Sequence, residues 1–385
     1  MAIPTTPVAP KGPVATDSDI PTIRPTLLDR DACYAEFDAI WQSGRVTAGP
    51  YTERLEEAIA RRVETAQAIC VGSCTAGLML LQRALGLSGD VIIPTFTWTA
   101  TGTSLLWNGC TPVFVDARPG DLTIDPNRID EAVTPQTTAI CAVAVFGVPS
   151  DRDRIAAVAK RHDLPVYYDA AQALGATYRD RPVGGSGVAE VFSLSPTKVV
   201  SAVEMGVVTT NDAELASRLR RMRDYGKSGL HEDITELGLS ARPSEFHAVI
   251  GYHNLKHIDE LIAHRGQMIA IYRARLAGVP GIDFQEIPPE CTSTNNYVVI
   301  FLGEECRVTR DEMFDALKNR GIACKRYFYP CLHRQTVFQS APYHISGSLA
   351  VSERAALQGL ALPLYGHITE EQVNRVADAV IAACG

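Results

Sequence analysis

The sequence has no long apolar run, no block of basic residues and no paired-cysteine motif, and each absence excludes a class of protein. No stretch approaches the roughly 18 uncharged apolar residues of a membrane-spanning helix. The 36 lysines and arginines are outnumbered by 44 aspartates and glutamates, so the net charge is −8 and no basic stripe indicates nucleic-acid binding. The ten cysteines include no CxxC pair, which argues against a disulfide framework. We therefore expect neither a membrane nor a nucleic acid as a partner.

The sequence also lacks a metal-binding pattern and an apolar leader. His253 and His257 are four residues apart in a stretch with helical spacing, but the zinc-protease pattern requires Glu where this chain has Asn254. We interpret the two histidines as part of a solvated helix face. Residues 1–20 contain one lysine and four prolines without an apolar segment. They are not typical of a secretory signal, so we expect a flexible arm and a cytoplasmic protein.

What the sequence does contain is an alternation of short apolar runs and helical segments. Hydrophobic residues make up 46 % of the chain and charged residues 21 %, enough for a sizeable core. The apolar runs are continuous rather than alternating, which is typical of strands covered on both faces of a parallel sheet. This pattern predicts an α/β fold with a mostly parallel sheet between helices. Strands are expected at 68–72, 90–94, 112–116, 139–147, 164–170, 189–195 and 206–212.

The pattern changes after two long helices predicted within 243–280. The remaining chain has a strand at 295–302, a helix at 310–320 and a last helix at 370–383, which indicates a small α+β unit. We therefore predict three parts: the arm at 1–20, a large domain at 21–260 and a small C-terminal domain at 261–385.

Four segments place reactive or anion-binding groups where strands end, which is where parallel-sheet proteins bind ligands. SCTAG (73–77) joins a strand to a helix whose N-terminus favours phosphate, although a simple tight turn is an equal alternative. Asp169 follows an apolar strand, and its alternative role is a helix N-cap. Trp98 lies on a loop after a strand, where an aromatic is more often core. Lys198 stands alone among apolar and hydroxyl residues in FSLSPTK, where a lysine is costly unless paired or used covalently.

Together these residues match the needs of pyridoxal phosphate. The cofactor needs a phosphate seat, an aromatic plate, a carboxylate that keeps the pyridine nitrogen protonated, and a lysine amine that forms a Schiff base. The chain resembles the DegT/DnrJ/StrS family of sugar-nucleotide aminotransferases, within the fold-type I, aspartate aminotransferase-like enzymes. The resemblance is carried, in order, by SCTAG, DVIIPTFTWTAT, TPVFVDARPGDLTID, AVFGVPSDRDRIAAVAKRH, YYDAAQALGA, FSLSPTK, RPSEFHAVIG and YFYPCLH.

The resemblance implies a role for individual residues. Lys198 is the Schiff-base lysine, Asp169 pairs with the pyridinium nitrogen, and Trp98 stacks on the ring. The remaining cofactor contacts come from backbone N–H groups, a hydroxyl and an amide near the phenolic oxygen; they belong to Thr75, Ala76, Ser193 and Gln172.

The resemblance also implies a substrate site shared between two subunits. Arg242 is expected to bind the diphosphate of a nucleotide sugar across a homodimer interface formed by residues 43–51 and 224–242. Tyr329 and His333 are expected to approach the sugar from the small domain. The alternative for Arg242 is a structural ion pair with Glu245.

Three positions depart from the family pattern. The family has Asn where this chain has Asp224, a second Asn at Ser240, and a glycine at Met205. An anion at Asp224 would repel a phosphate unless Lys227 or Arg223 compensates.

The predicted function is transfer of an amino group from an amino acid, L-glutamate, to a keto sugar nucleotide. Within the family the chain looks closest to enzymes that aminate C4 of a dTDP-4-keto-6-deoxyhexose for antibiotic sugars. Lys198 argues against the dehydratase branch of the family, which has histidine in its place. Two alternatives stay open: an enzyme of the same fold that acts on another carbonyl, and a non-catalytic regulator that keeps the fold.

Overall fold

The computed structural model describes residues 19–228 and 233–385 and contains one large sheet. Its order is β1 (Gln67–Val71), β9 (Gly206–Thr210), β8 (Ala189–Ser193), β5 (Val166–Asp169), β4 (Thr137–Val143), β2 (Asp90–Pro94), β3 (Thr111–Val115) and β12 (His344–Ile345). Only β9 runs antiparallel to its neighbours β1 and β8. The predicted α/β fold with a mostly parallel sheet is confirmed.

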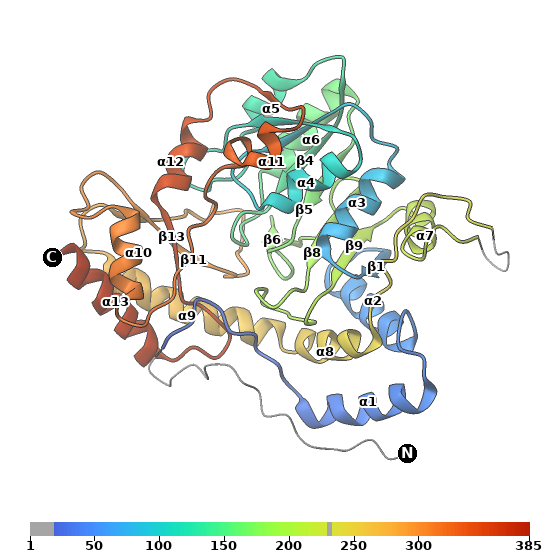
Figure 1. Ribbon diagram of the computed structural model, residues 1–385, viewed down its shortest axis with the longest axis horizontal. Helices are drawn as coiled ribbons and strands as arrows, with labels where there is room; N and C mark the ends of the chain where they lie inside the picture. Colours follow the sequence, from blue (N-terminus) through green and yellow to red (C-terminus); the bar gives the residue numbers. More distant parts are fainter. Residues whose placement is uncertain (1–18, 229–232) are drawn as a thin grey trace.

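The large sheet is almost completely buried from solvent because helices cover both of its faces. Every residue of β2, β5, β8 and β9 is buried, as the continuous apolar runs predicted. The covering helices are α2 (Pro50–Arg62), α3 (Cys74–Ala84), α4 (Thr99–Trp107), α5 (Pro126–Ala132), α6 (Arg152–His162) and α7 (Ala213–Met222). Figure 1 shows them gathered around the sheet, above α8 (Glu245–Leu255) and α1 (Arg30–Ser43).

Several helices begin where the sequence supplies a capping side chain. Ser73 accepts a hydrogen bond from the backbone N–H of Ala76 at the start of α3, and Asp212 accepts from two N–H groups at the start of α7. Such caps satisfy donors that have no partner within the helix. The local sequence therefore determines where α3 starts, directly after β1.

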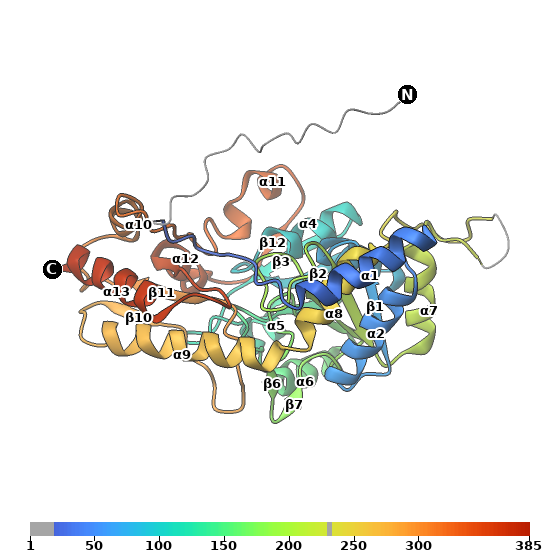
Figure 2. The ribbon, with the colours of Figure 1, turned by 90° about the horizontal axis from the view of Figure 1, so that it is seen from below.

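The C-terminal part forms a second, smaller core around a three-stranded antiparallel sheet. The sheet contains β10 (Ile282–Phe284), β11 (Val298–Leu302) and β13 (Gly359–Leu362). The helices α9 (Ile258–Leu276), α10 (Arg310–Lys318) and α13 (Glu370–Cys384) pack against it. Figure 2 shows α9 extending from this small unit to the underside of the large sheet.

Three segments have a placement that the sequence did not predict. The strand β12 is contributed by the C-terminal region and pairs with β3 at the edge of the large sheet; it follows η1 (Leu332–Arg334) and α11 (Thr336–Gln339) and precedes α12 (Ala350–Gln358). A two-stranded ribbon, β6 (Thr177–Tyr178) and β7 (Arg181–Pro182), stands apart from the sheet. Ile20 is buried in the small core and exchanges backbone hydrogen bonds with Gly321 and Ala323.

These contacts bear on the predicted three parts without deciding their limits. Residues 1–18 of the predicted arm lie outside the described residues, while Ile20 is anchored to the C-terminal unit. The limits 1–20, 21–260 and 261–385 stay a prediction. Among the residues that the structure describes, no helix is both long and apolar enough to cross a membrane.

Candidate active site

A cavity of about 280 Å³ opens at the carboxyl ends of five strands of the large sheet. The strands β1, β2, β4, β5 and β8 all end at its wall, as expected for a ligand site in a parallel sheet. Six of the seven predicted cofactor residues line it: Thr75, Trp98, Asp169, Gln172, Ser193 and Lys198. The structure therefore brings together residues that are up to 123 positions apart in the chain, since Thr75 and Lys198 differ by 198 − 75.

The start of α3 forms one end of the cavity and presents backbone donors. Ser73 and Thr75 line the cavity, and the first N–H groups of the helix have no acceptor within it. The predicted phosphate contact Ala76 does not line the cavity, and its N–H donates to Ser73 Oγ at 3.1 Å. Ser193 Oγ accepts from the N–H of Ser195 at 3.3 Å, so its own hydroxyl proton is available to a ligand. This arrangement suits a phosphate.

Gly206 allows the helix start to approach the sheet. A Cβ at this position would lie 2.5 Å from Cys74 N and from the Ser73 carbonyl group. Gly206 pairs with Ser193 in the sheet and with Val71 at the end of β1. Only glycine therefore keeps the donors of α3 next to Ser193.

Asp169 is a buried carboxylate held by two donors. Thr101 Oγ1 donates to its Oδ2 at 2.7 Å, and the N–H of Ala171 donates to its Oδ1 at 3.2 Å. Burial raises the pKa of the Asp169 carboxyl, whereas these hydrogen bonds and the charge of Lys198 oppose the rise. A positively charged N–H donor in the cavity would stabilise the ionised form.

An aromatic wall faces these polar groups. The Trp98 side chain is 56 % exposed, and its ring lies edge-on to that of Tyr327, with centroids 6.2 Å apart. Tyr327 and Tyr297 make a further edge-on contact at 5.0 Å. An exposed tryptophan beside a polar cavity can stack on a planar ligand, and the core alternative for Trp98 does not fit its exposure.

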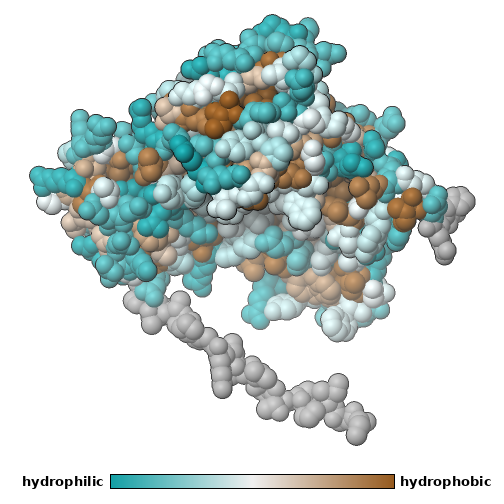
Figure 3. Space-filling model, turned by 45° about the horizontal axis from the view of Figure 1, so that its top comes forward, coloured by the Kyte–Doolittle hydropathy of each residue, from teal (hydrophilic) through white to brown (hydrophobic). Residues whose placement is uncertain are grey.

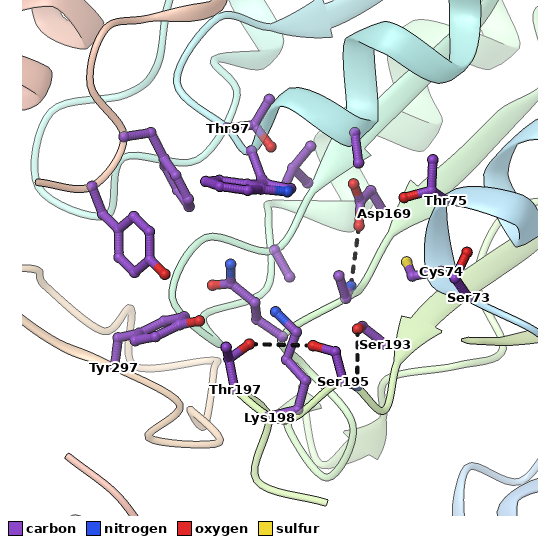
Figure 4. Close-up of a pocket in the computed structure, with 18 of the residues that line it drawn as sticks. Ser73, Cys74, Thr75, Thr97, Asp169, Ser193, Ser195, Thr197, Lys198 and Tyr297 are labelled. Carbon is purple, nitrogen blue, oxygen red and sulfur yellow. Dashed lines mark hydrogen bonds between the residues drawn. The ribbon is translucent and has the colours of Figure 1, made fainter. Parts of the chain in front are cut away.

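Lys198 projects into the cavity from the loop after β8 (Figure 4). Its backbone N–H donates to the carbonyl of Ser195, which closes the turn that carries it. Within 19–228 and 233–385, no carboxylate lies within ion-pair distance of its amine. Lys198 is thus a half-buried amine that is available for covalent chemistry.

The donor set fits pyridoxal phosphate. The helix start and Ser193 suit its phosphate, Asp169 suits a ring N–H, and Trp98 suits its plane. The buried Gln172 Oε1 has no partner among the described residues, so its amide is free to bond a ligand oxygen or hydroxyl, whichever way it is turned. Lys198 supplies the amine.

Arg242 does not pair with Glu245, the structural alternative considered for it. Its guanidinium lies 3.3 Å from Asp224, and Lys227 lies 3.6 Å from the same carboxylate. Glu245 instead accepts hydrogen bonds from the backbone of residues 51 and 52. The anion at Asp224 is therefore compensated, by Lys227 as predicted and by Arg242, which the prediction missed.

The predicted substrate residues Arg242, Tyr329 and His333 are not brought into the cavity. His333 is buried and bonds Thr95 Oγ1 at 2.7 Å and a carboxylate of α12 at 3.0 Å. Tyr329 faces outward beneath the guanidinium of Arg310. The loop that carries both residues reaches the cavity with Tyr327 and Phe328, and it has left the cavity lining by Tyr329.

The structure adds site residues that the sequence analysis missed. Thr101 orients Asp169 from the first turn of α4. Tyr297, Lys325 and Tyr327 line the cavity from the C-terminal unit. The sequence pattern could not predict these three residues, because their position in the cavity depends on how the two cores pack. For Thr101 the one available signal was its place in the segment that also contains Trp98.

The interpretation of the two histidines as a solvated helix face is wrong for His253, which is buried, whereas His257 is half-buried. His253 and His257 both contact Asp29 at the start of α1, at 3.1 and 3.2 Å. In the described part of the chain, no group of histidine, cysteine and acidic residues could hold a metal ion.

The comparisons with known proteins agree with this geometry. The model of the DegT/DnrJ/EryC1/StrS aminotransferase family matches residues 29–381. A dTDP-3-amino-3,4,6-trideoxy-alpha-D-glucose transaminase of Streptomyces venezuelae is 36 % identical over 93 % of this chain and 96 % of its own. A dTDP-4-amino-4,6-dideoxy-D-glucose transaminase of Escherichia coli is 29 % identical over 95 % and 99 %.

Solved structures extend the similarity to three dimensions. A crystal structure of DesI in the presence of its TDP-sugar product superposes with a TM-score of 0.90. The two sequences are 35 % identical, and the match covers 97 % of this chain and 95 % of that one.

Proposed function

The chain belongs to the DegT/DnrJ/EryC1/StrS aminotransferase family, and from this premise we propose that it moves an amino group from L-glutamate to the keto group of a dTDP-linked deoxysugar. It is a transaminase that uses pyridoxal phosphate. The observation that carries the proposal is the meeting of Lys198, Asp169 and Trp98 in one cavity beside the start of α3. A protein that merely kept the fold would not need this set.

The bound cofactor supplies an electron sink for the carbon that loses or gains a proton. The chain's own residues keep that sink effective. Asp169 would accept a hydrogen bond from the ring nitrogen and keep a proton on it, because a buried carboxylate favours a cationic partner. Thr101 and the N–H of Ala171 fix the direction of this carboxylate.

Lys198 Nζ is the proton-transfer group. Lys198 would hold the cofactor covalently through Nζ, and once an amino donor has released it the free amine would be the base placed to take a proton from the donor's Cα and to give it back as an acid. The same amine would move the proton in the opposite direction when the keto sugar is the acceptor. Trp98 and Ser193 would hold the ring and the phosphate of the cofactor and so keep the reaction near Nζ.

The acceptor is proposed to be a 4-keto-6-deoxyhexose attached to dTDP, aminated at C4. Support comes from the family and from relatives whose names specify dTDP-linked amino sugars. Those names include both C3 and C4 amino sugars, so the choice of C4 rests on the sequence resemblance. The product would serve antibiotic or other deoxysugar biosynthesis in the cytoplasm.

We propose a homodimer in which Arg242 of one subunit binds the diphosphate of the nucleotide sugar that occupies the site of the partner subunit. The predicted interface segment 43–51 pairs with the residues directly after the second segment, 224–242, because the N–H of Ala48 donates to the carbonyl of Pro243; residues 229–232 lie outside the described ones. Trp41 on α1 is 81 % exposed, and Figure 3 shows apolar patches interrupting the hydrophilic surface. We place Tyr329 and His333 toward the sugar end of the site, because they follow Tyr327 and Phe328, which line the cavity, along the same loop. Sedimentation that finds an active monomer would overturn this arrangement.

The deciding experiment incubates the holoenzyme with L-glutamate and a panel of dTDP- and UDP-ketosugars, with products identified by mass spectrometry. The proposal predicts an amino sugar from the dTDP-4-keto-6-deoxyhexose together with 2-oxoglutarate. Glutamate turnover with no product from any sugar nucleotide would favour the alternative, an enzyme for another carbonyl. Absence of any glutamate turnover would favour the non-catalytic regulator.

A further inference from the structure

The segment just before β11 reaches from the C-terminal unit to the loop that carries Lys198. Asn296 is 1 % exposed, and its Oδ1 accepts a hydrogen bond from the backbone N–H of Val199 at 3.1 Å. Val199 follows Lys198 directly. The carboxamide of Asn296 therefore holds the lysine loop from its C-terminal side.

Tyr297 holds the same loop from the other side. Its hydroxyl interacts with the side chain of Thr197, directly before Lys198, and with Tyr327. Lys198 Nζ lies 5.9 Å from the centre of the Tyr297 ring, and Figure 4 shows the hydroxyl pointing toward Thr197. Although burial alone would raise it, the charge of Lys198 and these hydrogen bonds lower the pKa of Tyr297.

A buried arginine fixes the segment itself. Arg265 of α9 is 3 % exposed, and its Nη1 donates to the backbone carbonyl of Asn296 at 3.1 Å. In the described chain no carboxylate lies within ion-pair distance of Arg265, and burial lowers its pKa to about 10. Burying a cation without a counterion costs free energy, so a functional benefit is expected to offset it. Rigid support of the lysine loop is such a benefit.

We propose that Asn296 and Tyr297 are positioning residues that set the location of the Lys198 amine, with Arg265 fixing the segment that carries them; the role of Lys198 in this inference rests on the proposed function. The C-terminal unit thereby contributes to the reaction without contacting the reacting carbon through these residues. The chemistry of Lys198 therefore depends on a hydrogen bond between Val199 and Asn296, which are 97 positions apart in the chain.

The test compares Asn296→Ala and Tyr297→Phe with Asn295→Ala. Asn295 is a matched control because its amide donates to the carbonyl of Ile262 and makes no contact with the lysine loop. Its backbone φ of +55° makes alanine strained there, so the control variant also carries a loss of general stability. We expect both test variants to lower kcat by about tenfold or more with little change in KM for glutamate, because a misplaced group affects the chemical step.

A second readout needs no catalysis and no cofactor. In the cofactor-free protein, the rate at which acetic anhydride acetylates Lys198 is measured at one pH by peptide mass spectrometry, with the exposed Lys160 as internal reference. We expect the rate for Lys198 relative to that for Lys160 to change by about twofold or more in Asn296→Ala and Tyr297→Phe, because the amine is displaced, and to stay unchanged in Asn295→Ala.

Two outcomes would overturn the inference. In the first, both test variants have the same kcat and the same acetylation of Lys198 as the wild type. The other is an equal effect of Asn295→Ala, which would make the segment a general structural support. If the wild-type protein shows no transaminase activity but the test variants still change the acetylation of Lys198 as expected, the proposed function is contradicted and the positioning role is supported.

Discussion

At the scale of single residues, Asp169 carries the most exacting demand. Asp169→Asn keeps the size and one acceptor but cannot hold a proton on a ring nitrogen, because an amide has no negative charge. We expect the variant to bind pyridoxal phosphate and to lose about a hundredfold or more in kcat. Stopped-flow measurement of the glutamate half-reaction checks this; a rate within about tenfold of wild type would exclude the assigned role.

Arg242 tests the substrate side of the site at the same scale. Arg242→Ala removes the guanidinium that would bind a diphosphate, and it also leaves Asp224 with Lys227 as its remaining cation. We expect a higher KM for the nucleotide sugar and an almost unchanged half-reaction with L-glutamate, which has no diphosphate.

The control for Arg242 is Asp224→Asn, which frees the guanidinium without removing it. That variant should keep or lower the KM for the nucleotide sugar. An equal loss in both half-reactions of Arg242→Ala would show instead that the pair with Asp224 is structural.

At the scale of elements, the junction of β9 with α3 depends on the absence of a side chain at Gly206. Gly206→Ala would force its Cβ against Cys74 N and the Ser73 carbonyl, so the helix start must move. We expect the Kd for pyridoxal phosphate to rise about tenfold or more, since the backbone donors and Ser193 would no longer converge. Gly278→Ala is the control, because a Cβ there meets nothing within 4 Å. Cofactor binding is measured by fluorescence titration, and equal Kd values for the two variants would contradict the close-approach argument.

The contact of α6 with β8 depends on a buried ion pair. Arg152 and Glu190 are 6 % and 0 % exposed and form a two-point contact, with Arg152 Nη2 and Glu190 Oε2 2.8 Å apart. Glu190→Gln leaves the arginine buried without a countercharge, which should lower the free energy of unfolding by about 3–5 kcal/mol. The exposed pair Glu57–Arg61 is the control, and Glu57→Gln should change it by less than about 1 kcal/mol. Urea unfolding monitors both; similar losses would show that the buried pair contributes no more than the surface one.

At the scale of the whole molecule, the local sequence predicted the elements better than their arrangement. The apolar runs and capping residues located the strands of the large sheet to within a few residues, because a strand that is buried on both faces has a continuous apolar sequence. The antiparallel direction of β9 and the addition of β12 to the sheet edge depend on tertiary pairing, which such runs do not encode.

The site shows the same division. Lys198, Asp169 and Trp98 were predictable because each follows an apolar strand in its own segment. Asn296 and Tyr297 were not, because Asn296 reaches the lysine loop and Tyr297 reaches the cavity only through the packing of the C-terminal unit. The alternative considered for Arg242, a pair with Glu245, was wrong because its guanidinium lies beside Asp224 and Glu245 accepts from backbone N–H groups instead.

The central claim is that Lys198 forms the covalent link to pyridoxal phosphate and carries the proton transfer. The most direct measurement reduces the holoenzyme with borohydride and maps the modified lysine by peptide mass spectrometry, in the wild type and in Lys198→Ala. The account predicts that the cofactor is found on Lys198 alone, and that Lys198→Ala folds with an unchanged circular dichroism spectrum but is not modified. Modification of another lysine, in either protein and at a comparable level, would contradict it.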